Sequence, residues 1–291
     1  MMEITVLSGK GGTGKTTVTA AIASLAENAV FCDNDVDASN LHLIFQPEIL
    51  EENDFNSGQK AQIDSSLCSN CGICFDNCRF DAIHSDSSGE FFINQFQCEG
   101  CRLCERICPE NAIKTTAKFE NHWFVSTSRF GDFVHARMAA GEENSGKLVT
   151  HIRKKAREIA KNHNCAYILN DGPPGIGCAA ISSLTGIDLA LIVIEPSLSG
   201  FHDAQRLVEL IHSFEIKAYA VINRFDINPE ITLEIETYLQ RAKIPLLAKI
   251  PFDKMVIEAM VNRKSVTEYC PECEITQIIC QIWNDIRISK N

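Results

Sequence analysis

Eight of the fourteen cysteines in the chain fall into two copies of one spacing pattern. Each copy has the form C-x2-C-x2-C-x3-C, at residues 68–78 and again at residues 98–108. This spacing lets a short loop place three thiolates on three corners of an iron–sulfur cube while the fourth cysteine points away. Two copies therefore predict two [4Fe-4S] clusters that exchange their fourth ligands. The predicted ligand sets are Cys68, Cys71, Cys74 and Cys108 for one cluster, and Cys98, Cys101, Cys104 and Cys78 for the other.

The segment around these cysteines is an internal duplication, because each copy is followed at the same offset by Ala-Ile, at residues 82–83 and 112–113. From Ile63 to about Thr116 it resembles the bacterial two-cluster ferredoxins. The proline that follows the last cysteine in that family is present as Pro109, but Arg79 takes its place in the first copy. The alternative is a pair of four-thiolate zinc sites, which also use C-x2-C pairs. Zinc does not require four thiolates in one run, twice, so we favour the clusters.

A second motif, Gly9-Lys-Gly-Gly-Thr-Gly-Lys-Thr16, fits the pattern G-x-x-x-x-G-K-[ST] and lies between a strand pattern and a helix pattern. Such a loop directs backbone N–H groups at phosphates. Lys15 is expected to neutralise the β and γ phosphates, and the hydroxyl of Thr16 is expected to bind Mg²⁺. The predicted nucleotide-binding residues here are Gly9, Lys10, Gly11, Gly12, Thr13, Gly14, Lys15, Thr16 and Thr17.

The extra lysine, Lys10, distinguishes this loop. The run G-K-G-G-T-G-K-T-T resembles the deviant Walker A motif of the P-loop ATPase superfamily of MinD, ParA and the nitrogenase iron protein. In that family the matching lysine reaches the nucleotide of a partner subunit, so the resemblance implies an ATP-dependent homodimer with Lys10 and Lys15 as catalytic residues. Asp171, followed by G-P-P-G-I-G, matches the Walker B aspartate of the family and is expected to hold Mg²⁺ through water.

Three aspartates at alternate positions, Asp33, Asp35 and Asp37, resemble switch I of the same family. Three carboxylates beside a triphosphate repel its negative charges, which is unfavourable unless the carboxylates bind a cation or accept a hydrogen bond from a water molecule. We expect Asp35 to orient the attacking water and the other two to assist Mg²⁺ or the switch; a turn-capping role is the alternative for each. Further along, Asn223 and Arg224 begin an N-R-F-D segment that superficially matches the guanine-binding N-K-x-D. The resemblance implies that Asn223 contacts adenine, which favours ATP over GTP.

Apolar runs and helical patterns alternate over most of the chain and provide the scaffold for these residues. Strands are predicted at 3–8, 29–33, 122–127, 166–171, 188–195, 216–223 and 245–250, and helices at 14–27, 147–162, 201–214, 229–241, 254–262 and 274–288. This order predicts an α/β P-loop NTPase fold with a mostly parallel sheet covered by helices on both faces. The alternation is lost from about residue 46 to residue 118. We therefore predict a discontinuous ATPase domain at 1–47 and 117–291, a polar linker at 48–62, and an inserted small α+β two-cluster ferredoxin-like domain at 63–116.

The composition of the chain indicates which classes of binding partner and which cellular compartment to expect. With 45% hydrophobic and 22% charged residues, the chain can bury a core. Its 27 basic and 38 acidic residues leave a net charge of -11, which argues against a general affinity for nucleic acid or anionic membrane. No stretch approaches the ~18 apolar residues of a membrane span. We expect a cytoplasmic protein, in which cysteines at metal-ligand spacing favour metal ligation over disulfides.

Together these motifs predict an ATPase whose nucleotide state gates electron transfer between the two clusters and an unidentified partner protein. Two alternatives remain at this stage. An iron–sulfur assembly carrier would hold a labile extra cluster, at Cys270-Pro-Glu-Cys273, and deliver it to an apoprotein. A positioning switch of the MinD type would use the insert for docking or redox sensing.

Overall fold

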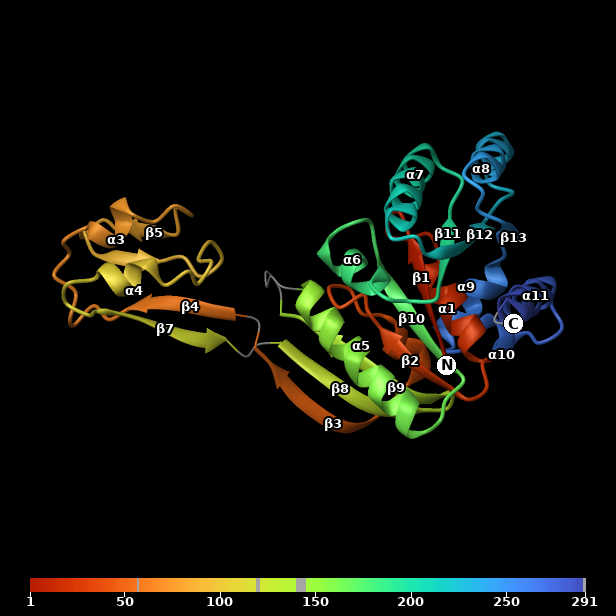
Figure 1. Cartoon of the computed structure of the whole chain (residues 1–291), viewed down its shortest axis with the longest axis horizontal. Helices are drawn as coiled ribbons and strands as arrows, with labels where there is room; N and C mark the ends of the chain where they lie inside the picture. The colour runs from red at the N-terminus through yellow and green to blue at the C-terminus, as the bar shows by residue number, and fades with distance from the viewer. Residues whose placement is uncertain (57, 119–120, 140–144, 290–291) are drawn as a thin grey trace. The chain divides into compact units, whose positions relative to one another are not determined.

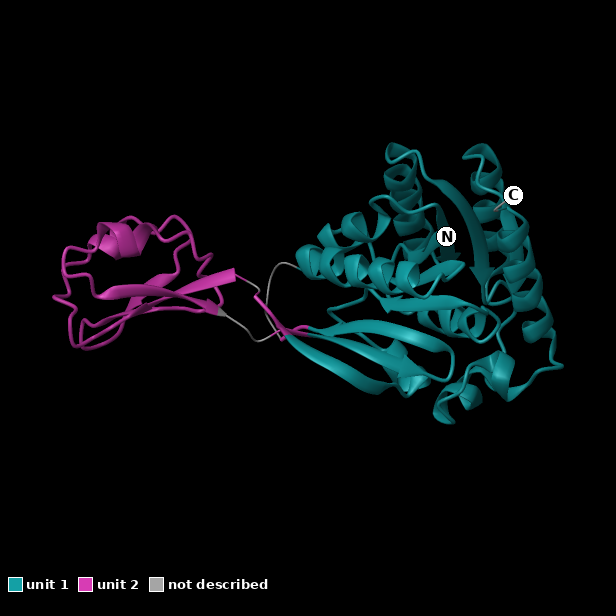
Figure 2. Cartoon of the chain, turned by 60° about the horizontal axis from the view of Figure 1, so that its bottom comes forward, with its two compact units in different colours: residues 1–53, 123–137, 145–291 teal, residues 54–122, 138–144 magenta. Residues whose placement is uncertain are grey.

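The computed structural model describes residues 1–56, 58–118, 121–139 and 145–289. The chain divides into two compact units (Figure 2). Unit 1 comprises residues 1–53, 123–137 and 145–291, and unit 2 comprises residues 54–122 and 138–144.

A nine-stranded sheet with the order β13-β12-β11-β1-β10-β2-β9-β8-β3 forms the centre of unit 1 (Figure 1). Neighbouring strands from β13 to β9 pair in parallel. Every residue of β1, β2 and β11 is buried, as expected for strands covered on both faces. The predicted α/β fold with a mostly parallel sheet is confirmed. The strands are β1 (Met2–Ser8), β2 (Ala29–Asp33), β3 (Glu48–Phe55), β8 (Asn121–Ser128), β9 (Gly131–Arg137), β10 (Tyr167–Pro174), β11 (Leu189–Ile194), β12 (Lys217–Asn223) and β13 (Leu246–Ile250).

Helices pack on both faces of this sheet. One face carries α1 (Lys15–Ala23), α2 (Leu41–Phe45), α9 (Lys254–Val261), α10 (Val266–Tyr269) and α11 (Glu274–Ile288). The other carries α5 (Ser145–Asn162), α6 (Cys178–Leu184), α7 (Leu198–Ser213) and α8 (Pro229–Arg241). Each long helix buries an apolar stripe; in α11 it contains Ile275, Ile279, Ile282 and Ile286, spaced three or four residues apart. Among the described helices, none combines the length and the apolar character needed to cross a membrane.

The structure differs from the sequence prediction mainly between residues 46 and 137. The predicted linker at 48–62 is instead occupied by β3 and the start of β4 (Gly58–Ile63). Its acidic composition misled the prediction because β3 is the edge strand of the sheet, with most of its side chains exposed. Strand β9 was missed although Phe133–Ala136 are buried. The helices α2, α6 and α10 were missed because each is too short to show a helical period.

Unit 2 is a small α+β arrangement with approximate internal repetition. Strand β4 pairs antiparallel with β7 (Ile113–Lys118), and β5 (Ile83–Ser85) pairs antiparallel with β6 (Phe91–Ile93). Each cysteine run contributes one short helix, α3 (Ile73–Asp76) or α4 (Leu103–Ile107). The isoleucines of the two repeated Ala-Ile pairs, Ile83 and Ile113, are both buried in the core of this unit, beside several of the cysteines.

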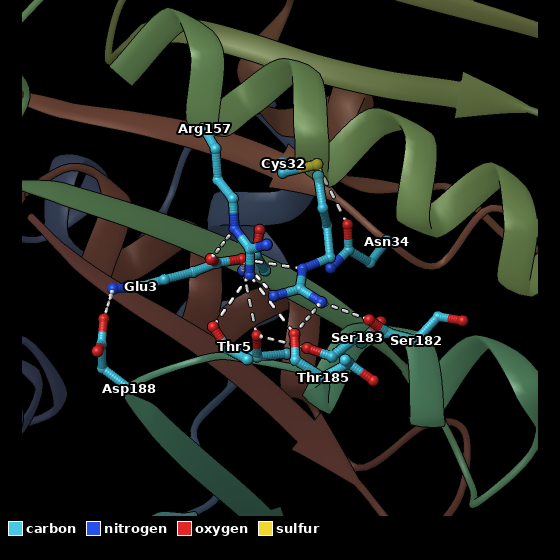
Figure 3. Close-up of polar contacts among 12 residues, drawn as sticks. Glu3, Thr5, Cys32, Asn34, Arg157, Ser182, Ser183, Thr185 and Asp188 are labelled. Atoms are coloured by element: carbon cyan, nitrogen blue, oxygen red, sulfur yellow. Dashed lines mark hydrogen bonds and ion pairs between the residues drawn. The ribbon is translucent and has the colours of Figure 1, made fainter. Parts of the chain in front are cut away.

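A buried polar network joins α5 to the centre of the large sheet (Figure 3). Glu3 of β1 is 4% exposed, and its carboxylate accepts hydrogen bonds from Arg153 (2.6 Å) and Arg157 (2.6 Å). The side-chain amide of Asn170, in the middle of β10, donates to the same carboxylate at 3.0 Å. Arg153 also donates to the carbonyl oxygen of Thr185 at 3.0 Å. Because β1 and β10 lead into the phosphate-binding loop and the Walker B segment, this network fixes the strands beneath the candidate site.

Candidate functional site

The phosphate-binding loop occupies residues 9–14, between β1 and α1. Gly14 is the N-cap of α1 and has φ 91°, in the left-handed region that glycine adopts without strain. A side chain at Gly14 would collide with the amide of Asn223, and one at Gly9 would collide with the backbone of Asp203. These two glycines therefore allow the loop to lie close against the ends of β12 and α7. The loop leads directly into the N-terminus of α1, where unpaired N–H groups suit a phosphate.

Lys15 lies at the centre of a cluster of acidic side chains. Its ammonium nitrogen is 3.2 Å from Asp171 Oδ1 and 3.5 Å from Asp35 Oδ2. Burial alone would lower the pKa of Lys15, but the negative charges of Asp171, Asp35 and Asp33 outweigh it and raise the pKa. Lys15 is therefore a buried cation at neutral pH, held in the place where the phosphate motif requires one.

Asp171 connects α1 to the Walker B strand. Its Oδ2 accepts a hydrogen bond of 2.6 Å from the hydroxyl of Thr16, and its Oδ1 lies 2.8 Å from the hydroxyl of Thr19. The structure thus brings together the two residues predicted to hold Mg²⁺, Thr16 and Asp171. Thr19 was not predicted; its position one helical turn after Lys15 is the signal that would have identified it.

Asp33 is fully buried at the end of β2. Its Oδ2 accepts hydrogen bonds from the Ser39 hydroxyl (2.7 Å) and the Leu41 amide (3.2 Å), and its Oδ1 accepts one from the Asp35 amide (3.1 Å). Burial and the charge of Asp171 raise the pKa of Asp33 to about 7. In this structure Asp33 therefore performs the turn-organising role that was the alternative at each aspartate, and its part in Mg²⁺ binding stays a prediction.

The other two aspartates of the segment differ in position. Asp35 faces Lys15, and burial raises the pKa of Asp35 although the charge of Lys15 opposes the rise. A carboxylate with a raised pKa is better suited to take a proton from water near neutral pH than an ordinary one. Asp37 is exposed, and no hydrogen bond ties it to the described phosphate site.

The distinctive lysine, Lys10, is held by residues at the end of β11. Its ammonium nitrogen is 2.8 Å from Ser197 Oγ and 3.4 Å from Glu195 Oε2. Glu195 Oε1 is also 3.0 Å from Arg224 Nη1, so one carboxylate pairs with both cations. Sequence reasoning missed Glu195 and Ser197. The signal was available, because they directly follow a parallel strand, at the sheet edge where ligands bind in α/β folds.

A cavity opens beside α1, next to the phosphate loop. Its polar edge is formed by Gly14, Thr17, Asn223, Arg224 and Asp253. The Asn223 side chain donates a hydrogen bond of 2.7 Å to the carbonyl oxygen of Thr13 and so joins the cavity to the phosphate loop. The remaining lining is largely apolar: Val18, Ala21, Ile250, Pro251, Phe252, Val256, Ile257, Met260, Val266, Ile275 and Ile279. Such a cavity suits a planar heterocyclic base, and we refer to it as the base pocket.

The eight cysteines of the duplicated motif line two cavities in unit 2. One cavity is lined by the first predicted ligand set, and the other by the second set together with Cys74. Each cavity therefore includes at least one cysteine from the opposite run: Cys108 in the first, and Cys78 with Cys74 in the second. Pairing of β4 with β7 brings the two runs together, with Ile63 opposite Ile113. The ligand assignment itself stays a prediction.

The chemistry of these cavities fits a polynuclear group. Within the described ranges, no three Cys, His, Asp or Glu side chains converge closely enough to hold a single metal ion. Each cavity is lined by at least four cysteines, which is the number of thiolates that a [4Fe-4S] cube takes. Burial raises the pKa of Cys104 to about 11, so this side chain is a thiol at neutral pH unless a bound metal displaces its proton.

Cys270 and Cys273, the remaining C-x-x-C pair, lie outside unit 2. Cys270 follows the last residue of α10, and Cys273 is the N-cap of α11. Both are half-buried, and the turn between them is close to residues that line the base pocket. This pair therefore belongs to unit 1, whereas the eight cysteines of the duplicated motif belong to unit 2.

Comparison with known proteins extends these observations. Residues 4–266 match the family model described as the CobQ/CobB/MinD/ParA nucleotide binding domain. The uncharacterized protein MJ0578 of Methanocaldococcus jannaschii is 35% identical over 231 residues, which cover 78% of this chain and 80% of that protein.

Two solved structures share the fold. The septum site-determining protein MinD of Pyrococcus horikoshii, in complex with Mg-ADP, has a TM-score of 0.57 at 18% identity and covers 98% of this chain and 95% of its own. MinD from the MinC:MinD complex of Aquifex aeolicus has a TM-score of 0.57 at 20% identity, covering 99% of this chain and 96% of its own. At identities this low, the structural similarity shows a shared fold and nothing about function.

Proposed function

Because the chain belongs to the CobQ/CobB/MinD/ParA nucleotide-binding family, we propose that it couples ATP binding and hydrolysis to electron transfer between two [4Fe-4S] clusters and a partner protein. One observation carries this proposal. A single chain contains a phosphate loop with its acidic partners in unit 1 and two cavities lined by at least four cysteines each in unit 2. Neither feature alone distinguishes a redox ATPase from a plain ATPase or a plain ferredoxin.

In the nucleotide half, the side chains supply binding, orientation and proton transfer. Lys15 provides a buried cation for the β and γ phosphates, and Asn223 with the apolar base pocket receives the base. Thr16 and Asp171 would hold Mg²⁺, which neutralises charge on the phosphates when it is bound. Asp35 orients the attacking water and accepts its proton, as its raised pKa permits.

In the redox half, the eight cysteines would hold the clusters, with Cys108 and Cys78 exchanged between the two runs. When bound, such clusters store and pass single electrons. The protein's own contribution is to fix Cys74 and Cys104 on the short helices α3 and α4 and to bury part of the cysteine side chains, since burial and hydrogen bonding set cluster potentials.

The chain path provides a connection between the halves. From Asp33 the chain passes through the hydrogen-bonded turn and α2 and enters β3, whose last residues already belong to unit 2. A nucleotide that alters the hydrogen bonds of Asp33 therefore acts on the segment leading directly to the insert. Order–disorder and hinge changes of such switch segments are a common means of transmitting nucleotide state.

Dimerisation is part of the same proposal. Lys10 occupies the position of the additional lysine in the deviant Walker A motif. Its side chain is 27% exposed and contacts Ser197. We infer that a second copy docks on this face when ATP is bound, with Lys10 transferring from its own Glu195 to the nucleotide of the partner. The MinD comparison in complex with MinC shows that relatives of this fold also bind unlike partners.

The test is stopped-flow reoxidation of the dithionite-reduced protein by a one-electron acceptor dye under anaerobic conditions. In the wild type, Mg-ATP should change the rate by about threefold or more, which corresponds to a small change in activation free energy. Lys15→Ala should abolish this response while retaining about eight iron atoms per chain. Lys161→Ala, an exposed lysine of α5, is the matched control and should respond like the wild type.

Two results would contradict the proposal. After anaerobic reconstitution, contents of iron and acid-labile sulfide far below those of two clusters per chain would show that the chain does not hold the proposed clusters. A full ATP response in Lys15→Ala would show that the change in rate does not arise from nucleotide in the phosphate loop.

A further inference from the structure

The segment Cys270-Pro-Glu-Cys273 forms a tight turn between two helices. The Cys273 amide donates a hydrogen bond of 3.3 Å to the Cys270 carbonyl oxygen, the i to i+3 bond of a β-turn, with proline at the second position. Such a turn keeps the first and fourth Cα atoms within about 7 Å, close to the span of up to about 6.8 Å that a disulfide bridges. Thr276 anchors both residues, because its Oγ1 donates to the Cys270 carbonyl oxygen and lies 3.4 Å from Cys273 Sγ.

The geometry points to a dithiol–disulfide exchange site at Cys270 and Cys273, whose oxidation by an organic disulfide weakens nucleotide binding in the base pocket. Both thiols are half-buried, so a small disulfide can reach them. The inference about nucleotide rests on the proposed ATP site, whereas formation of the disulfide does not.

Cys273 is the attacking group of the pair. It is the N-cap of the fifteen-residue helix α11, where free N–H groups favour a thiolate. Burial would raise the pKa of Cys273, but hydrogen bonds with Thr276 stabilise the thiolate and the net effect is a lowered pKa. Cys270 is the resolving thiol, because its hydrogen bond to Cys273 raises the pKa of Cys270.

The exchange proceeds in two balanced steps. The thiolate of Cys273 attacks one sulfur of the incoming disulfide, forms a mixed disulfide and releases one thiolate. The thiolate of Cys270 then attacks the Cys273 sulfur, closing the intramolecular bond and releasing the second thiolate. The pair loses two electrons and two protons in total, and the organic disulfide gains them as two thiols.

The turn is built into the wall of the base pocket. Val266 of α10 precedes it and Ile275 of α11 follows it, and both line the pocket. Thr276 Oγ1 donates to the Cys270 carbonyl oxygen at 2.8 Å and lies 3.4 Å from Cys273 Sγ, so α11 is fastened to the turn. The two thiols are free in this structure, so closing a sulfur–sulfur bond of about 2.05 Å shifts this turn and the pocket wall with it.

The test uses the intact, cluster-loaded chain under anaerobic conditions, with glutathione disulfide as the probe. After acid quenching and alkylation, trypsin releases one peptide, residues 265–287, that contains Cys270, Cys273 and Cys280. The inference predicts a product in which Cys280 alone is alkylated and the other two are joined. It also predicts that the Kd for an ATP analogue rises by about threefold or more on oxidation and returns after reduction.

Three variants decide between outcomes. Cys280→Ser should keep both the disulfide and the affinity change, whereas Cys273→Ser should lose both. A peptide that stays fully alkylated, or a disulfide that leaves the Kd unchanged, overturns the inference. Loss of iron in a Cys270→Ser variant would also overturn it, because the pair would then be a metal site. If the reduced protein binds no nucleotide, the proposed ATP site has failed, and peptide mapping still reports on the disulfide separately.

Discussion

Two arginines on α5 share one carboxylate but differ in burial, and replacing each by methionine should separate the two effects. Arg153 and Glu3 are 4% and 5% exposed at the side chain, whereas Arg157 is 40% exposed. Both arginines approach Glu3 to 2.6 Å. The two arginines therefore lie at the same distance from the Glu3 carboxylate but differ in their exposure to solvent.

The expected costs follow from these surroundings. Arg153→Met leaves the buried Glu3 with a single cationic partner and removes the shorter of two hydrogen bonds that arginines donate to the Thr185 carbonyl oxygen. Breaking a buried ion pair costs about 3–5 kcal/mol of unfolding free energy. Arg157→Met removes a partly exposed pair, for which about 0.2–1 kcal/mol is typical. Methionine retains the apolar stem in both variants, so lost packing contributes little.

Urea unfolding followed by tryptophan fluorescence suits this comparison, because both tryptophans, Trp123 and Trp283, belong to unit 1. Arg153→Met should lower the midpoint several times more than Arg157→Met, with an unchanged slope. Equal midpoints for the two variants, or a loss below about 1 kcal/mol for Arg153→Met, would refute the reasoning that burial determines the value of this pair.

Two further predictions concern the sites themselves. Cys98→Ser should reduce iron by about half, to about four atoms per chain, whereas Cys280→Ser should leave it unchanged; equal iron in both variants would contradict the ligand assignment. For Asp33, burial raises the pKa from 3.8 to about 7, so the folded state binds the extra proton between these values. The contribution of Asp33 to stability is therefore present at low pH and is lost as pH rises from about 4 to about 7, and Asp33→Asn should flatten the fall in melting temperature over that range in the nucleotide-free protein. A slope identical to that of the wild type would show that Asp33 does not titrate there.

Local sequence signals predicted those parts of the fold that are determined locally. Helices 229–241 and 274–288 were placed at their observed ends, because amphipathic stripes and end signals such as Asn228 and Pro229 define them. The phosphate loop was equally clear, since its glycines and lysine are contiguous. The acidic β3 could not be recognised, because its strand character comes from pairing at the sheet edge.

Features that depend on distant residues were only partly accessible. Spacing alone suggested that each predicted ligand set includes one cysteine from the opposite run. The two runs come together, however, because β4 pairs with β7 some fifty residues away in the sequence. The pairing of Glu195 with both Lys10 and Arg224 joins three strand ends, and no local pattern encodes it. The same holds for the position of the 270–273 turn beside the base pocket.

An anaerobic EPR redox titration, with and without Mg²⁺ and a non-hydrolysable ATP analogue, tests most directly whether nucleotide and clusters are coupled. Coupling predicts two [4Fe-4S] signals, at least one of which shifts in midpoint potential by about 60 mV, equivalent to a tenfold change in a one-electron equilibrium. Lys15→Ala should show the same clusters without the shift. Potentials that are unchanged by nucleotide in the wild type would contradict the account.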